Sequence, residues 1–141
     1  MSKKSFFKIG ILVLVLSLAL PLAACRVRQA NITNFVDLPV YGAKNNALAQ
    51  AQVRKAILDA CKKRNWVARE ISPGLISATR EVRGKHMARV EIPFSGTRYS
   101  IIYKDSSNLQ YDASKNVINR NYNSWVNYLR QDIEMALAQA G

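Results

Sequence analysis

The sequence has few of the residues, and none of the motifs, that most enzymes use for catalysis. Its 141 residues include one histidine and two cysteines. It contains no Gly-rich phosphate loop, no Cys-x-x-Cys spacing of metal ligands and no Gly-x-Ser-x-Gly nucleophile motif. The nine acidic residues are scattered, so no carboxylate pair for glycoside hydrolysis is indicated. The sequence therefore predicts no catalytic, metal or cofactor site, and it favours a non-catalytic protein over an enzyme.

The first 24 residues are typical of an export signal that is removed from the mature protein. Lys3, Lys4 and Lys8 precede an apolar stretch of twelve residues, 9–20. This stretch is too short to span a bilayer comfortably as a permanent helix. Its length and its basic flank are those of a cleavable signal.

The end of this signal indicates lipid attachment. Leu22-Ala23-Ala24-Cys25 closely resembles the lipobox of bacterial lipoproteins. In that family the small residues enter a protease site in extended form, and the cysteine thiol carries diacylglycerol, which makes Cys25 the predicted attachment site. Several acyl chains, each gaining about 0.8 kcal/mol per buried methylene, hold such a protein on its membrane. The alternative is an ordinary secretory signal with a chance cysteine.

The residue after Cys25 bears on the choice of membrane. It is Arg26, whereas in lipoproteins of Gram-negative bacteria an Asp there usually marks retention in the inner membrane. The resemblance therefore implies a location in the outer membrane, on the face toward the periplasm.

Acidic residues are scarce relative to basic ones. The chain has 21 Lys and Arg against 9 Asp and Glu, and without the three lysines of the signal the surplus is nine. Such a surplus favours anionic partners. Nucleic acid is excluded, because an exported and tethered protein rarely meets it. The predicted partners are the membrane, through the lipid on Cys25, and anionic lipid or another envelope component; the oligomeric state is left open.

Residues 47–141 are predicted to form one α+β domain. Residues 25–46 are expected to be a lipidated tether, in which 35–41 docks on the domain as an extended edge segment. Apolar residues at helical spacing predict a first helix over 47–64, with Asn46 as its N-cap, and a last helix over 119–139. Between them, four strands are expected at 66–71, 75–82, 86–94 and 97–105. The predicted architecture is a helix, a four-stranded antiparallel meander and a helix, with both helices packed on one face of the sheet.

The turns predict how these strands pair. A three-residue loop, Arg83-Gly84-Lys85, keeps the apolar residues of the second and third strands on one face. A two-residue turn at Ser95-Gly96 would place Phe94 opposite Thr97 and Val90 opposite Ile101. The same register places His86 opposite Asp105.

Four segments from about residue 66 onward resemble a family of small uncharacterised lipoproteins of Gram-negative bacteria. They are residues 86–92 (HMARVEI), 99–103 (YSIIY), 107–111 (SNLQY) and 121–126 (NYNSWV). The resemblance implies an α+β fold and a periplasmic location, and it implies no activity.

Two groups of residues are candidate ligand sites. The predicted pairing with Asp105 could orient His86 for base catalysis, and Tyr99 and Tyr103 could line an aromatic wall that holds sugars or peptides. The simpler interpretations are a polar pair that closes the end of the sheet and an ordinary aromatic core.

Four basic residues gather around one predicted hairpin: Arg80, Arg83, Lys85 and Arg89. They could contact lipid phosphates or an acidic partner, and the simpler interpretation is a solvated hairpin. Cys61 has no predicted disulfide partner and is expected to be a small buried hydrophobe.

Together these features predict an outer-membrane-anchored, periplasm-facing lipoprotein that serves as a non-catalytic binding or scaffolding module of the cell envelope. The alternative is a small enzyme or ligand-binding domain that acts on cell-wall glycan or peptide material around His86 and the tyrosines.

Overall fold

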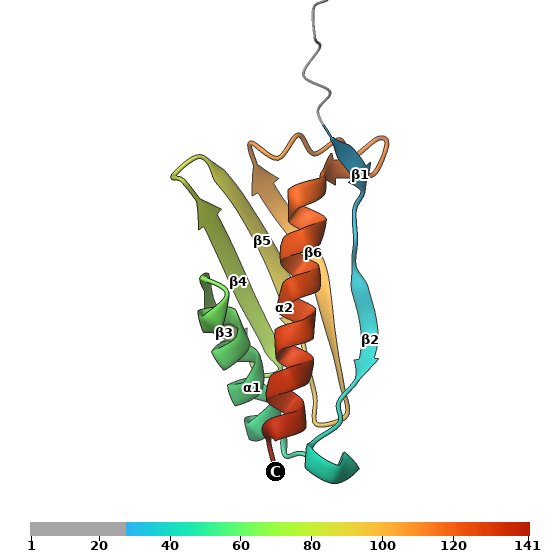
Figure 1. The fold of residues 1–141 in the computed structure, drawn as a ribbon, viewed down its shortest axis with the longest axis vertical. Coiled ribbons are helices and arrows are strands. Elements are labelled where there is room, and N and C mark those ends of the chain that lie inside the picture. Colours follow the sequence, from blue (N-terminus) through green and yellow to red (C-terminus); the bar gives the residue numbers. More distant parts are fainter. Residues whose placement is uncertain (1–27) are drawn as a thin grey trace, which may run out of the picture.

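The computed structural model describes residues 28–141, and the predicted signal and Cys25 lie outside the described residues (Figure 1). The helices and strands follow in chain order: β1 (Gln29–Asn31), β2 (Phe35–Pro39), a short 3-10 helix η1 (Ala43–Asn45), α1 (Gln50–Lys63), β3 (Trp66–Ser72), β4 (Leu75–Val82), β5 (His86–Pro93), β6 (Arg98–Ser107), β7 (Val117–Asn119) and α2 (Arg120–Gln139).

The predicted α+β class is confirmed, with a larger sheet than expected. Strands β3 to β6 form the predicted meander, and β2 adds a fifth strand in the antiparallel order β2-β6-β5-β4-β3. The position of β2 confirms the expected docking of the edge segment 35–41. Figure 1 shows α1 and α2 side by side over this sheet. A second sheet, made of β1 and β7, was not predicted, and it places residues 29–31 of the expected tether within the fold.

The two helices begin in different ways. The start of α2 agrees with the prediction within one residue, and the Asn119 side chain accepts a hydrogen bond from the Asn121 N–H at 3.0 Å. The predicted cap of α1 is wrong, because Asn46 ends the 3-10 helix and α1 begins at Gln50. At the start of α1 the side-chain oxygen of Gln52 instead accepts a hydrogen bond from the Ala49 N–H, at 2.8 Å.

The β4–β5 hairpin has the predicted loop. Val82 faces His86 across Arg83-Gly84-Lys85, and Gly84 takes the left-handed conformation with a φ of 61°. The three-residue connection places Ala78 opposite Val90, with both side chains buried.

The predicted turn between β5 and β6 is wrong. Phe94 pairs with Tyr99, so four residues connect them instead of two. The Ser95 hydroxyl accepts hydrogen bonds from the N–H groups of Thr97 (3.2 Å) and Arg98 (3.1 Å), which holds this wider loop together. The register moves by two residues, so the side chains stay on the predicted faces and Tyr99 and Ile101 are buried.

An irregularity further along β6 changes the faces. Val90 pairs with Tyr103, but the next pair is Arg89 with Asp105, so Lys104 is an extra residue on β6. Such a bulge places two residues of one strand opposite one of its neighbour. Asp105 therefore lies opposite Arg89, and the predicted pairing of His86 with Asp105 is wrong.

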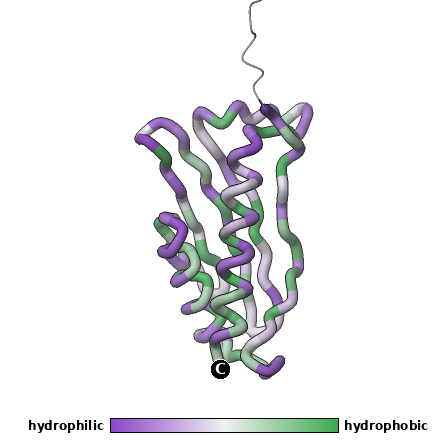
Figure 2. The backbone as a smooth tube through the Cα atoms, in the orientation of Figure 1, coloured by the Kyte–Doolittle hydropathy of each residue, from purple (hydrophilic) through white to green (hydrophobic). Residues whose placement is uncertain are grey.

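The core lies between the sheet and the two helices. The apolar stripe of α2 contributes five residues that are each at most 2 % exposed: Tyr122, Val126, Leu129, Ile133 and Leu137. Trp125, on the same helix, is only partly buried at the edge of the core. Figure 2 shows hydrophobic and hydrophilic residues alternating along the strands, as expected for a sheet covered on one face.

Two substitutions on α2 test this orientation. Leu129→Ala should lower the free energy of unfolding by about 2–5 kcal/mol, because it opens a cavity in the core. Met135→Ala should change it by less than about 1 kcal/mol, because the Met135 side chain is 48 % exposed. Chemical denaturation measures both values. Equal losses at the two positions would contradict the packing of α2 described here.

Candidate functional site

The structure separates the two residues of the proposed catalytic pair. The Asp105 Oδ2 atom lies 3.5 Å from Nη1 of Arg89 on the uncovered face of the sheet. The His86 Nδ1 atom is 2.8 Å from the main-chain oxygen of Asn108. His86 thus joins the β4–β5 hairpin to the segment after β6. The pairing that could have oriented His86 as a base is therefore not present.

The tyrosines divide into a core residue and a surface cluster. Tyr99 is only 1 % exposed, and burial raises its pKa. The Tyr103 ring packs between Tyr111 (4.6 Å between centroids) and Tyr122 (5.5 Å). Its hydroxyl is 2.9 Å from that of Ser106, and burial raises its pKa. Tyr111 is 41 % exposed, so it is the member of this cluster that reaches the surface.

The four basic residues of the predicted hairpin cluster have different roles. The Arg80 guanidinium lies over the Trp125 ring, 5.1 Å from its centroid, and donates a hydrogen bond to the Arg64 carbonyl at 2.6 Å. Burial, followed by the repulsion of Arg64, lowers the pKa of Arg80. Arg89 pairs with Asp105. Of the four, only Arg83 and Lys85, at the tip of the hairpin, are exposed.

A buried carboxylate on α2 was missed by the sequence analysis. The Asp132 side chain is 1 % exposed and pairs with Lys63, 3.0 Å away, and with Arg64. The hydrogen bond from Arg64 outweighs burial and lowers the pKa of Asp132. The Arg64 guanidinium also lies over the Tyr128 ring at 5.1 Å. The sequence did contain a sign of this buried acid. Asp132 follows Leu129 by three residues, so it lies within the apolar stripe of the last helix.

This ion pair connects the end of α1 to the middle of α2. The two cations lie at the C-terminal end of α1, where they also complement the partial negative charge of the helix dipole. A buried charge with two cationic partners is costly to leave unpaired. Its position indicates a structural role, which is to set the position of α1 along α2.

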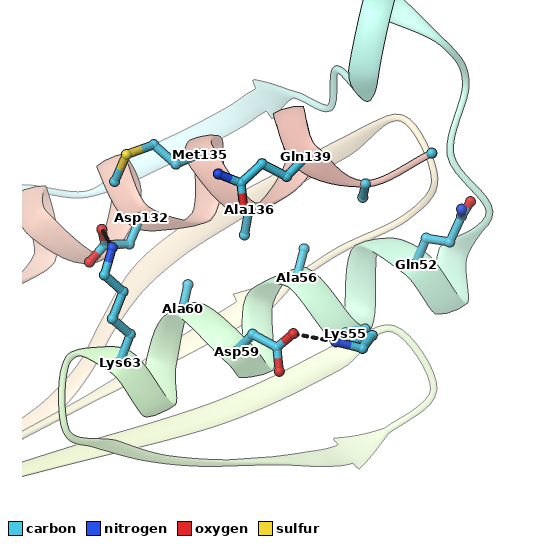
Figure 3. A pocket seen from close by; sticks show the side chains of 12 residues that line it. Gln52, Lys55, Ala56, Asp59, Ala60, Lys63, Asp132, Met135, Ala136 and Gln139 are labelled. Atoms are coloured by element: carbon cyan, nitrogen blue, oxygen red, sulfur yellow. Dashed lines mark hydrogen bonds and ion pairs between the residues drawn. The ribbon is translucent and has the colours of Figure 1, made fainter.

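A groove of about 490 Å³ lies between α1 and α2 and ends at this ion pair (Figure 3). Ala56 and Ala60 of α1 face Ala136 of α2 in Figure 3, and their small side chains leave the space. Lys55 and Asp59 pair with each other at 2.5 Å on the rim. The groove therefore has an apolar floor and a polar rim whose charges are mutually neutralised. Such a surface can bind a partner, and its two carboxylates, Asp59 and Asp132, are both held in ion pairs.

A second hollow, of about 420 Å³, lies beside the first turns of α2. It is lined by Ala30, Thr33, Phe35, Arg120, Asn123, Ser124 and Asn127. The Asn123 amide donates to the Asn31 carbonyl at 2.7 Å, and its oxygen accepts from the Thr33 N–H at 3.0 Å. Asn123 thus uses its side chain to hold the chain between β1 and β2 against α2.

Within residues 28–141, no group of three or more His, Cys, Asp and Glu side chains is placed to hold a metal ion. Neither α1 nor α2 is long and apolar enough to cross a membrane. Cys61 is buried in α1, and burial raises the pKa of its thiol to about 12.

The cations around Asp132 allow a test of its structural role. Replacing both Lys63 and Arg64 by Ala leaves the carboxylate buried without a cation, and the free energy of unfolding at neutral pH should fall by about 3 kcal/mol or more. Lys62→Ala is the control, because Lys62 is exposed and forms no ion pair within residues 28–141. It should change stability by less than about 0.5 kcal/mol. A loss below about 1 kcal/mol in the double variant would show that Asp132 does not depend on these cations.

The charge of Asp132 should also give a pH-dependent stability. Because its folded pKa lies below the ordinary value of 3.8, the charge stabilises the fold above that value. The contribution is lost as the pH falls through the folded pKa. The stability difference between the parent and Asp132→Asn should therefore be constant between about pH 5 and 7 and shrink below about pH 4. A difference that persists unchanged at acid pH would contradict this assignment.

The resemblance of residues 86–92, 99–103, 107–111 and 121–126 to small lipoproteins remains a prediction, as does the lipid on Cys25. No protein-family model, curated protein sequence or solved structure matches this chain significantly.

Proposed function

We propose that this protein is anchored in the bacterial outer membrane by lipid on Cys25, faces the periplasm, and acts as a non-catalytic binding or scaffolding module of the cell envelope. The observation that carries the proposal is Leu22-Ala23-Ala24-Cys25, placed directly after an apolar segment with a basic start. The folded domain follows almost at once, since β1 begins at Gln29. A domain so close to its anchor works at the membrane surface.

The contacts within the domain support binding rather than catalysis. His86, Asp105 and Asp132, which could have served as a base or a nucleophile, each contact a group that holds two parts of the fold together. Tyr99 is enclosed in the core. The alternative, an enzyme or ligand-binding domain acting on cell-wall material around His86 and the tyrosines, lacks a supporting observation among residues 28–141.

The groove between α1 and α2 is the surface best suited to a partner in the envelope. It lies toward the C-terminal end of α2, at the opposite end of the domain from β1, where the described chain begins (Figure 1). Its floor of small residues and its neutralised rim favour a partner segment of low net charge over a strongly charged one.

Anchoring and location are tested together by two substitutions in the full chain. Cys25→Ser removes the acceptor of the lipid, so the protein should leave the membrane fraction and lose the mass of its acyl chains. Arg26→Asp places an acid after Cys25 and should move the lipidated protein from the outer to the inner membrane in density-gradient fractions. Arg26→Lys, which keeps the charge, should not. If Cys25→Ser is still membrane-bound like the parent, the anchor is wrong; if Arg26→Asp stays in the outer membrane, the sorting argument is wrong.

A further inference from the structure

The short connection between Cys25 and the folded domain determines which end of the domain meets the membrane. Three residue steps separate Cys25 from Arg28, where the described chain begins. Each step spans at most about 3.6 Å, so the two Cα atoms are no more than about 11 Å apart. If Cys25 carries lipid, as proposed above, the end of the domain that contains Arg28 is held against the bilayer surface.

This end, here called the anchor end, consists of residues 28–31, 83–86 and 108–120. In Figure 1 these segments lie together at the top of the molecule, and hydrogen bonds join them into one surface. The Asn108 amide donates to the Lys85 carbonyl at 2.7 Å, and the Gln29 amide donates to the Gln110 carbonyl at 2.8 Å. The Arg120 N–H donates to the Arg28 carbonyl at 2.9 Å.

The anchor end carries exposed basic side chains that form no ion pair in the described chain. Arg28, Arg83, Lys85 and Arg120 are all exposed, and none of them forms an ion pair within residues 28–141. Most acids lie elsewhere and are already paired. The acids at or next to this end are Asp112, which is paired with Lys115 at 3.7 Å, and Glu81, close to Gly84. Positive charge therefore remains in excess here.

Two further features suit this end to a membrane surface. The first turn of α2 has no acid to complement the positive end of its helix dipole, and it carries Arg120 instead. Tyr111, in the segment 108–120 of the anchor end, is exposed and has its ring against Tyr103. Tyrosine is enriched where bilayer and water meet, because its ring is apolar and its hydroxyl is polar. Figure 2 shows the hairpin tip and the start of α2 as hydrophilic.

We propose that the anchor end docks on anionic phospholipid, with Arg28, Arg83, Lys85 and Arg120 at the level of the headgroup phosphates. A basic residue close to an anionic bilayer favours the docked state by about fivefold. Because the anchor holds the domain at the surface, its effective concentration there is high, and a few such contacts are sufficient. Docking by this end keeps the long axis of the domain from lying flat on the bilayer, and it turns the groove between α1 and α2 toward the periplasm.

The experiment uses the lipidated full-length protein in vesicles of neutral phosphatidylcholine, with or without phosphatidylglycerol. A dye on the thiol introduced by Ala113→Cys reports on the anchor end, because Ala113 is exposed in the turn before β7. Lipids with a quencher on the headgroup then measure how closely this end approaches the bilayer. Cys61 does not compete for the dye, since it is buried and its thiol has a raised pKa.

Docking should give stronger quenching in anionic than in neutral vesicles. Raising the salt from about 0.1 to about 1 M shortens the screening length from about 10 to about 3 Å and should release the domain. Arg83→Gln with Lys85→Gln removes two contacts and should lower the ratio of docked to undocked protein by about 25-fold. The matched control is Lys44→Gln with Arg69→Gln, because both residues are exposed, form no ion pair in the described chain and lie outside the anchor end. It removes the same charge and should leave the quenching unchanged.

Flotation of the protein with the vesicles reports on the anchor separately from docking. A protein that does not float contradicts the lipid anchor itself, whereas a protein that floats but shows equal quenching in neutral and anionic vesicles overturns docking alone. If the two double variants lost quenching equally, the binding would depend on net charge in general and not on the anchor end, and the proposal would be overturned. Inorganic phosphate, added at constant ionic strength, should have no effect. Release by phosphate under these conditions would indicate a site for the free ion and overturn the proposal.

Discussion

The apolar stripe of α2 packs against one face of the sheet, and most other features of this domain depend on that burial. Leu129 and Ile133 are fully enclosed only if the inward side chains of β4, β5 and β6 meet them. A strand that slipped by one residue would turn its apolar set toward water. This explains why β4, β5 and the part of β6 up to Tyr103 keep their predicted faces even though the loop after β5 has a different length.

The polar residues that enter the protein serve the same packing. Asp132 lies in the stripe of α2 because Lys63 and Arg64, at the end of α1, reach it from the neighbouring helix. Arg80 is tolerated at the edge of the core because its guanidinium lies on the Trp125 ring and donates to the Arg64 carbonyl. Charges that resemble a reactive cluster in the sequence are thus distributed over separate contacts between helices and sheet.

The two ends of the domain differ in a way that fits a tethered protein. Hydrogen bonds gather the first described residues, the tip of the β4–β5 hairpin and the start of α2 at one end, with exposed Arg and Lys side chains. The groove between the helices lies toward the other end, and its rim charges neutralise each other. One end has the charge pattern that suits a lipid surface, and the other has the hollow shape that suits a partner segment.

Local patterns in the sequence determined the α+β class, the limits of β4 and α2, and the three-residue loop at Arg83-Gly84-Lys85. A local pattern also predicts the anchor at Cys25. Those features depend on residues that are near one another in the chain, such as a cap, a left-handed glycine or an apolar period. Only the tertiary structure decided that Lys104 bulges, that Asp105 meets Arg89 instead of His86, and that Asp132 is buried. The pairing of β1 with β7 and of Lys63 with Asp132 joins residues about 70 to 90 positions apart. No short-range periodicity records such contacts, because they exist only once the helices lie on the sheet.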